Sequence, residues 1–292
     1  VAALAMAEAL RPLADIRVKW PNDLVLNGRK LAGILAEAGF DGLELVTGPE
    51  TWLRGAGRVV RLARRHGLQV YTVHQALTPI VGGGPAERLR DALDAAFEVG
   101  CSHLVIHPPT VDAWEHPAAQ RWLATLDEAS QQLDGSGVRI ALENSGYPPH
   151  EAGRRILGQL PDLLAFAEQH DLDITFDACH AAIQRLDLLE AYALLRPRVA
   201  NVHLSNLSPD EPLLDLPYMR PLLTEHRMPE DGVMPLDEFT TLLAADGYAG
   251  PVTYEVSPIA LRAWSPAGLR RALAALVDYL RVRRRPAPDS PL

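Results

Sequence analysis

The strongest constraint on the fold is an alternation of short apolar runs with longer amphipathic segments, which begins near residue 39. The runs are rich in β-branched residues and most end on a polar residue, as strands do, and most start about 27 to 35 residues after the previous one. The intervening segments carry apolar residues at helical spacing. The predicted strands are 42–46, 69–74, 103–107, 138–143, 173–177, 199–204 and 251–255, and the predicted helices include 85–99, 118–133, 160–170 and 183–195.

Repeated strand–helix units with mainly apolar strands predict a parallel sheet that closes into a TIM (β/α)8 barrel. Closure requires one more strand, for which 16–26 is the candidate, followed by a helix over about 28–38. We therefore expect a front segment at 1–38 that is not an independent domain, a barrel at 39–283 and a flexible tail at 284–292. A doubly wound open sheet is the rival, but no glycine-rich phosphate loop follows an early strand.

Composition narrows the class of protein. The 292 residues are 48% hydrophobic and 22% charged, and no apolar run reaches the roughly 18 residues that a membrane span needs. The net charge of −9 argues against a general nucleic-acid partner. Cys101 and Cys179 form no spacing motif, which favours the cytoplasm. The only lysines are Lys19 and Lys30, so no Schiff-base lysine exists beyond the front segment.

Imidazoles and carboxylates gather at the predicted strand ends. Strands of a parallel barrel all end on one face, so these side chains should converge there, and such a mixture suits Zn²⁺, Mn²⁺ or Fe²⁺. Other histidines are expected to be ordinary hydrogen-bonded residues, with His66 and His170 at helix ends. The converging residues are His74, His107, Glu143, Asp177, His203 and Glu255, followed closely by His180 and His226.

The motifs "AGFDGLEL", "VIHPP", "ALENSG", "TFDACHA", "VHLSN" and "TYEVSP" resemble those of the xylose isomerase-like TIM barrels, over about residues 39–283. That superfamily holds sugar isomerases and epimerases together with endonuclease IV. The resemblance implies one to three divalent ions (Mn, Zn, Mg or Co). The first would be held by Glu143, Asp177, His203 and Glu255, the second by His74 and His107 with Glu143, and the third by His180 and His226. The third set departs from the endonuclease pattern, because Thr224 stands where that family has an aspartate.

The resemblance leaves several functions open. In an isomerase or epimerase of a sugar or sugar phosphate, Glu143 and Glu255 would pass a proton to and from one carbon while His180 binds a substrate oxygen. In a multi-zinc phosphodiesterase, the ions would generate hydroxide. The superfamily's DNA endonucleases have a tyrosine at the position of Leu77, which argues against that alternative. A non-catalytic metal-binding protein is the third possibility, and a homo-oligomer is compatible with each.

The stretch "KWPNDLVLNGRKLAGILAEA" resembles a different family, the biotin protein ligases. There the corresponding Asp23 and Lys30 contact the biotinyl-adenylate. The resemblance covers only about residues 1–38, and the ligase's adenylate loop and biotin pocket have no counterpart in the rest of the sequence. Two residues without those surfaces do not make a binding pocket. We therefore expect the segment to have a structural role.

Overall fold

The computed structural model describes residues 16–19, 23–26, 29–76, 83–209 and 220–283. Leu77 and the tail at 284–292 lie outside the described residues, as do the side chains of Asp23 and Lys30. Within the described parts of the chain, no helix combines the length and the apolar composition needed to cross a lipid bilayer.

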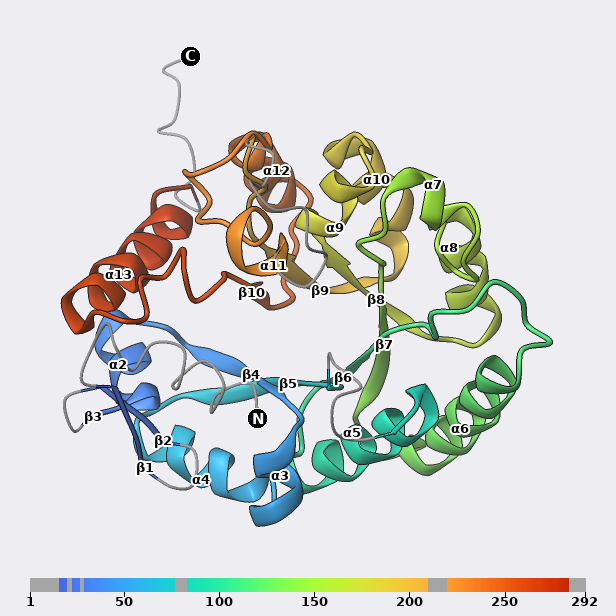
Figure 1. Cartoon of the computed structure of the whole chain (residues 1–292), viewed down its shortest axis with the longest axis horizontal. Coiled ribbons are helices and arrows are strands. Elements are labelled where there is room, and N and C mark those ends of the chain that lie inside the picture. The colour runs from blue at the N-terminus through green and yellow to red at the C-terminus, as the bar shows by residue number, and fades with distance from the viewer. Residues whose placement is uncertain (1–15, 20–22, 27–28, 77–82, 210–219, 284–292) are drawn as a thin grey trace.

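Seven parallel strands form a nearly closed barrel in which each strand pairs with the next along the chain (Figure 1). Each observed strand matches its predicted range to within one residue at either end. The sequence periodicity therefore predicted the wall of the barrel correctly. The strands are β4 Gly42–Val46, β5 Gln69–His74, β6 His103–Ile106, β7 Arg139–Glu143, β8 Asp173–Asp177, β9 Val199–Leu204 and β10 Val252–Tyr254.

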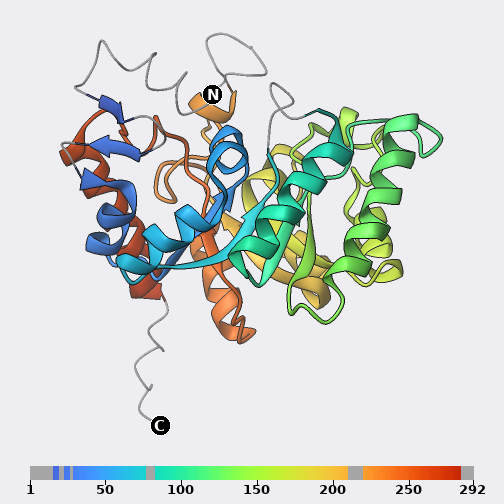
Figure 2. The same ribbon diagram turned by 90° about the horizontal axis from the view of Figure 1, so that it is seen from below.

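Helices surround this sheet on the outside (Figures 1 and 2). Several begin with proline in the first turn, where its missing N–H costs nothing. Helix α5 is followed directly by Gly100, whose φ of 67° favours glycine. Apolar faces of these helices pack on the strands; Trp122, for example, is fully buried. The helices are α3 Pro49–Arg54, α4 Gly57–Arg65, α5 Pro85–Val99, α6 Pro117–Leu133, α7 Pro149–Ala152, α8 Leu160–Gln169, α9 Ala178–Ile183, α10 Leu188–Leu195, α11 Arg220–Leu223, α12 Leu236–Ala245 and α13 Pro266–Arg283, with a 3₁₀ turn at Arg196–Arg198.

The predicted eighth barrel strand at 16–26 is not part of the barrel. Its two halves, β1 Ile16–Lys19 and β2 Asp23–Leu26, pair antiparallel with each other, and β2 also pairs with β3 Arg29–Lys30. The three strands lie outside the barrel, beside α2 (Figures 1 and 2). The physical reason is in the sequence, because Pro21 and Asn22 divide the run and favour a turn over a continuous central strand.

The helix predicted after that run does belong with the barrel. Helix α2, Leu31–Ala38, packs against α13, and Ile34 is buried in a small cluster with Leu269, Leu273 and Leu276. Both helices lie beside the outermost strands, β4 and β10, which are not paired with each other. A cavity of about 980 Å³ lies at this side, and its lining reaches from α2 and α13 to Glu44, His74 and Glu255.

Candidate metal centre

Four neighbouring strands bring two glutamates, an aspartate and a histidine to one end of the barrel. Glu143 and Asp177 are the last residues of β7 and β8, His203 is the penultimate residue of β9, and Glu255 directly follows β10. Asp177 pairs with His203 in the sheet, so the two residues lie at the same level along the barrel. One atom from each of the four lies within 4.8 Å of one atom of every other, so the four could hold one ion.

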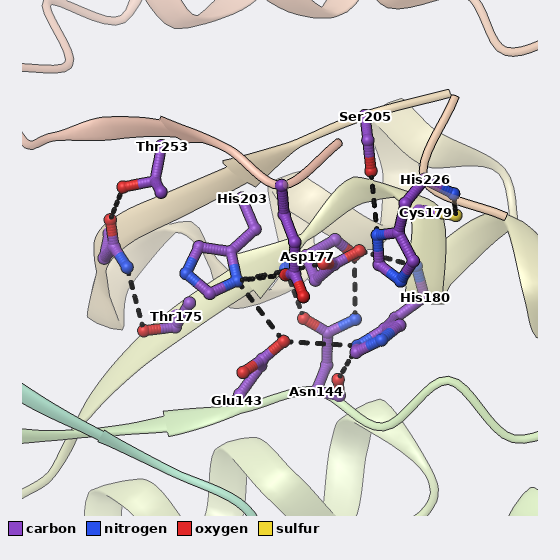
Figure 3. Close-up of polar contacts among 12 residues, drawn as sticks. Glu143, Asn144, Thr175, Asp177, Cys179, His180, His203, Ser205, His226 and Thr253 are labelled. Carbon is purple, nitrogen blue, oxygen red and sulfur yellow. Dashed lines mark hydrogen bonds and ion pairs between the residues drawn. The ribbon is translucent and has the colours of Figure 1, made fainter. Parts of the chain in front are cut away.

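The Nδ1 atom of His203 is the centre of this group (Figure 3). It lies 2.9 Å from Oε2 of Glu255, 3.4 Å from Oε1 of Glu143 and 3.8 Å from Oδ2 of Asp177. Three of these buried atoms, His203 Nδ1, Glu255 Oε2 and Asp177 Oδ2, have no hydrogen-bond partner of good geometry. Unpaired buried polar atoms are costly, and a divalent cation would satisfy all of them at once. The donor set therefore fits a transition metal.

The charges of the group are strongly coupled. Burial disfavours ionisation of Glu143 and Glu255, yet the facing imidazoles outweigh it and hold the pKa of both carboxyls below the ordinary value. Burial likewise opposes a charged His203, but the surrounding carboxylates raise its pKa well above the ordinary value. Asp177 behaves differently, since burial and the neighbouring glutamates raise its pKa. Without a cation, the cluster is thus held together by imidazolium–carboxylate pairs.

A second group of three lies on the other side of Glu143. His74 Nε2 is 2.9 Å and His107 Nε2 is 3.1 Å from Glu143 Oε2, and the two imidazole nitrogens are 3.3 Å apart. The other nitrogen of His74 lies 2.6 Å from the carbonyl oxygen of Gln75, which directs Nε2 toward the glutamate. Burial lowers the pKa of His74, but Glu143 and Glu44 outweigh it and raise it to about 9. Glu143 faces both groups and could bridge two ions.

His180 and His226 lie nearby but are not part of a compact group of three ligands among the described residues. His180 Nδ1 is 2.8 Å from the carbonyl oxygen of Asn144 and 3.3 Å from Glu143 Oε1. His226 Nδ1 is 3.1 Å from Ser205 Oγ, and its φ of 49° is unusual for a residue other than glycine. The two rings are 5.7 Å apart (Figure 3). A third ion at these histidines remains a prediction.

Asn144 locks the two central strands together just beyond their ends. Its side-chain amide donates to the carbonyl of Asp177 at 3.0 Å and accepts from the Asp177 backbone N–H at 2.7 Å. Asp177 also caps α9, because its Oδ1 accepts from the N–H of His180 at 2.7 Å. These bonds hold the backbone that carries Glu143, Asp177 and His180 in place.

Glu44 is a member of the cluster that the strand-end criterion missed. It lies in the middle of β4, and its Oε2 is 3.2 Å from His203 Nε2 and 2.7 Å from Thr72 Oγ1. Burial raises its pKa, but His203 and its other neighbours outweigh this and lower it, so Glu44 is a buried carboxylate. The signal that could have found it is a glutamate inside the otherwise apolar run "GLELV".

The remaining described histidines make ordinary contacts, as expected. His66 and His170 are the C-terminal capping residues of α4 and α8. His103 lies at the opposite end of the barrel, where its Nε2 is 3.2 Å from Asp173 Oδ2.

Comparison with known protein families agrees with this geometry. The model of the xylose isomerase-like TIM barrel family matches residues 33–279. The chain belongs to this family. An uncharacterized protein of Mycobacterium tuberculosis is 28% identical to it over 245 residues, which cover 77% of this chain and 82% of the relative.

Solved structures share the fold at low identity. A D-tagatose 3-epimerase-like protein superposes with a TM-score of 0.63 at 20% identity, covering 86% of this chain and 96% of that one. The 3-keto-D-glucoside 4-epimerase of Escherichia coli gives 0.60 at 20% identity, covering 86% and 94%. Similarity at this level establishes the barrel but not the reaction.

The front of the chain matches a second family. The model of the biotin/lipoate A/B protein ligase family covers residues 1–43. The bifunctional ligase/repressor of Escherichia coli is 67% identical over 39 residues, which are 13% of this chain but only 12% of that protein. The chain therefore carries a small piece of a ligase-like sequence joined to a xylose isomerase-like barrel.

Proposed function

We propose that this protein is a divalent-metal-dependent isomerase or epimerase of a sugar or sugar phosphate. The observation that carries the proposal is the convergence of Glu143, Asp177, His203 and Glu255, the last three of which each have a buried polar atom without a good hydrogen-bond partner. Such a set suits Mn²⁺, Zn²⁺, Mg²⁺ or Co²⁺, held by these four residues.

The two glutamates suit proton transfer at one carbon. A bound ion would polarise the carbonyl and hydroxyl oxygens of a hydroxy-ketone, which makes the adjacent C–H acidic. The pKa of both glutamates is lowered, so each is an ionised carboxylate. A lowered pKa also makes each a weaker base, so proton removal would depend on the acidity that the ion gives the C–H. They come from β7 and from the end of β10, and the strands between them carry Asp177 and His203. In this role one glutamate removes the proton and the other returns it, while His180 binds a substrate oxygen.

A cavity between β4 and β10 reaches the cluster and leaves room for a small molecule, although most of its lining is apolar, including side chains of α2 and α13. The cavity that reaches Glu44, His74 and Glu255 has a volume of about 980 Å³, at the upper end of the range for small-molecule sites. Solved structures of similar fold include a D-tagatose 3-epimerase-like protein and a 3-keto-D-glucoside 4-epimerase. Both descriptions concern keto-sugars, which is why we propose a substrate of that class.

The test is hydrogen exchange in deuterated water with a panel of keto-sugars and their phosphates. Wild-type protein reconstituted with Mn²⁺ or Co²⁺ should incorporate deuterium at one carbon of its substrate. Glu255→Gln, assayed at saturating metal with its metal content measured, should lose exchange by at least about 10³-fold, because an amide cannot accept the proton. Asp127→Asn, far from the site and 58% exposed, is the control and should exchange normally.

A phosphodiesterase is the second candidate, favoured by the group His74, His107 and Glu143. If the protein is an isomerase, alanine variants of the two histidines should raise KM more than they lower kcat. If those histidines hold a hydroxide-generating ion, their loss should reduce turnover of an aryl phosphodiester severely. Diesterase turnover that depends on both histidines, without exchange on any sugar, would replace the isomerase proposal. Protein that takes up no metal would exclude both.

A further inference from the structure

We propose that Glu44 is a positioning residue that makes His203 a stronger and correctly oriented metal ligand. The inference deepens the proposed function and rests on the metal site proposed there. Glu44 itself is not one of the four ligands. It acts through the far side of the His203 ring, from a strand that contributes nothing else to the cluster.

The two nitrogens of His203 face different partners. Nδ1 faces the carboxylates of Glu143, Asp177 and Glu255, whereas Nε2 lies 3.2 Å from Glu44 Oε2. A carboxylate can only accept, so the Nε2 hydrogen donates to Glu44. The lone pair that remains for a metal is then on Nδ1, which is the nitrogen that points at the other carboxylates.

The side chain of Glu44 is itself held in place. Thr72 Oγ1, on the neighbouring strand β5, donates to the same Oε2 atom at 2.7 Å, and the pairing of Glu44 with Thr72 in the sheet fixes this contact. Glu44 is 9% exposed and His203 is fully buried. In such surroundings a charged acceptor strengthens its hydrogen bond and raises the electron density on the imidazole.

An alternative is that Glu44, His74 and His203 hold an ion of their own, since one atom from each lies within 4.8 Å of the others. The hydrogen bonds argue against it. Oε2 of Glu44 already accepts from Thr72, and the Nε2 hydrogen of His203 would have to be lost before that nitrogen could bind an ion. A Glu44 carboxylate that accepts from Thr72 and from His203 accounts for both hydrogen bonds without a separate ion.

The experiment compares Glu44→Gln with Thr72→Val in the full-length protein. Gln keeps the size of the side chain and an acceptor oxygen but removes the charge, whereas Val leaves the carboxylate and removes only its second donor. We expect Glu44→Gln to weaken Co²⁺ binding about 10- to 100-fold, measured by competition with a chromophoric chelator. Thr72→Val should remain within about threefold of wild type. The visible spectrum of bound Co²⁺ should change in Glu44→Gln only.

Two controls separate this role from general stability and from the function itself. Metal-free Glu44→Gln should stay folded at the assay temperature but with a Tm below that of wild type, because it removes one partner of the buried pair between Glu44 and His203. Equal Co²⁺ affinity in Glu44→Gln and wild type would overturn the positioning role, as would equal losses of Co²⁺ affinity in Glu44→Gln and Thr72→Val. Wild type that binds no Co²⁺ would instead overturn the proposed function.

Discussion

The front segment and the barrel differ in their sequence identity to known relatives and in the share of each relative that the match covers. Over 39 residues the front of the chain is 67% identical to a biotin ligase, but it represents 12% of that protein. The barrel is only 28% identical to its mycobacterial relative, yet the match covers 82% of the relative. The high identity belongs to a match over a small part of the relative, and the low identity belongs to a match over most of a relative. The share of the relative that is matched, rather than the identity, therefore shows which family's fold the described part of the chain has.

The two regions also differ in how far apart in the sequence the strands that build them lie. The small sheet β1–β3 is built from segments that are neighbours along the chain, and its strands pair only with one another. The candidate metal centre instead needs strands β4 to β10, which span residues 42–254, in correct register. The small sheet therefore needs only a short piece of the chain, whereas the candidate metal centre requires the whole barrel.

The largest expected effect is on thermal stability, and it distinguishes the contribution of helix α2 from that of the small sheet β1–β3. Deleting residues 1–38 removes α2 and with it Ile34, which is 1% exposed and packs on Leu269, Leu273 and Leu276 of α13. Loss of that side chain alone should cost about 2 to 5 kcal/mol, or roughly 5 to 15 °C in Tm. Deleting only residues 1–30 should shift the Tm by less than about 3 °C.

Calorimetry of both truncated proteins and of Ile34→Ala provides the comparison. The point substitution should reproduce a large part of the loss seen on deleting 1–38, with the small sheet still present. Equal destabilisation by the two deletions would mean that the sheet β1–β3, not α2, supports the barrel.

A smaller effect is expected at the end of the barrel opposite the metal centre. Asp173 is 16% exposed, and its Oδ2 lies 2.6 Å from Arg139 Nε and 3.2 Å from His103 Nε2. Burial opposes its charge, but these two partners outweigh it and lower its pKa to about 2. Because the folded pKa lies below the unfolded value of 3.8, the stabilisation is present above pH 3.8 and is lost as the pH falls through about 2. Asp173→Asn should therefore cost about 2 kcal/mol at pH 7.

Urea unfolding at several pH values measures this contribution. The gap between wild type and Asp173→Asn should be constant from pH 7 to about pH 5 and should narrow below pH 4. Asp127→Asn is the matched control, because Asp127 is 58% exposed and lies 3.9 Å from His170 Nδ1, a pair that contributes little. A gap that stays constant down to pH 2.5 would show that Asp173 acts through packing rather than charge.

Much of the barrel was predictable because the sequence pattern that specifies its strands and helices repeats along the chain. Apolar runs of strand length at regular spacing gave seven strands to within a residue, and parallel strands necessarily bring their ends to one face. This explains why His74, Glu143, Asp177 and His203 were chosen correctly as neighbours. That they bind metal remains a prediction.

Two features were not predictable by the same rule. The rule selected strand ends, so it passed over Glu44, which reaches the cluster from the middle of β4. The need for an eighth strand also led us to assign 16–26 to the barrel, although Pro21 within it argued for a turn. In both cases local side-chain chemistry, rather than the repeat, determined the outcome.

The smallest expected effect concerns Lys30 at the end of β3. The resemblance to the biotin ligases implies that the corresponding lysine contacts an adenylate there, but the 39 residues that align with the Escherichia coli ligase are too few by themselves to surround such a ligand. Lys30→Ala should leave Co²⁺ affinity, sugar exchange and Tm within experimental error of wild type. Wild type should also form no biotinyl-adenylate from biotin and ATP in a radiolabelled assay. Adenylate formation that disappears in Lys30→Ala would show that the front segment carries ligase chemistry, and would reverse the contrast between the two regions.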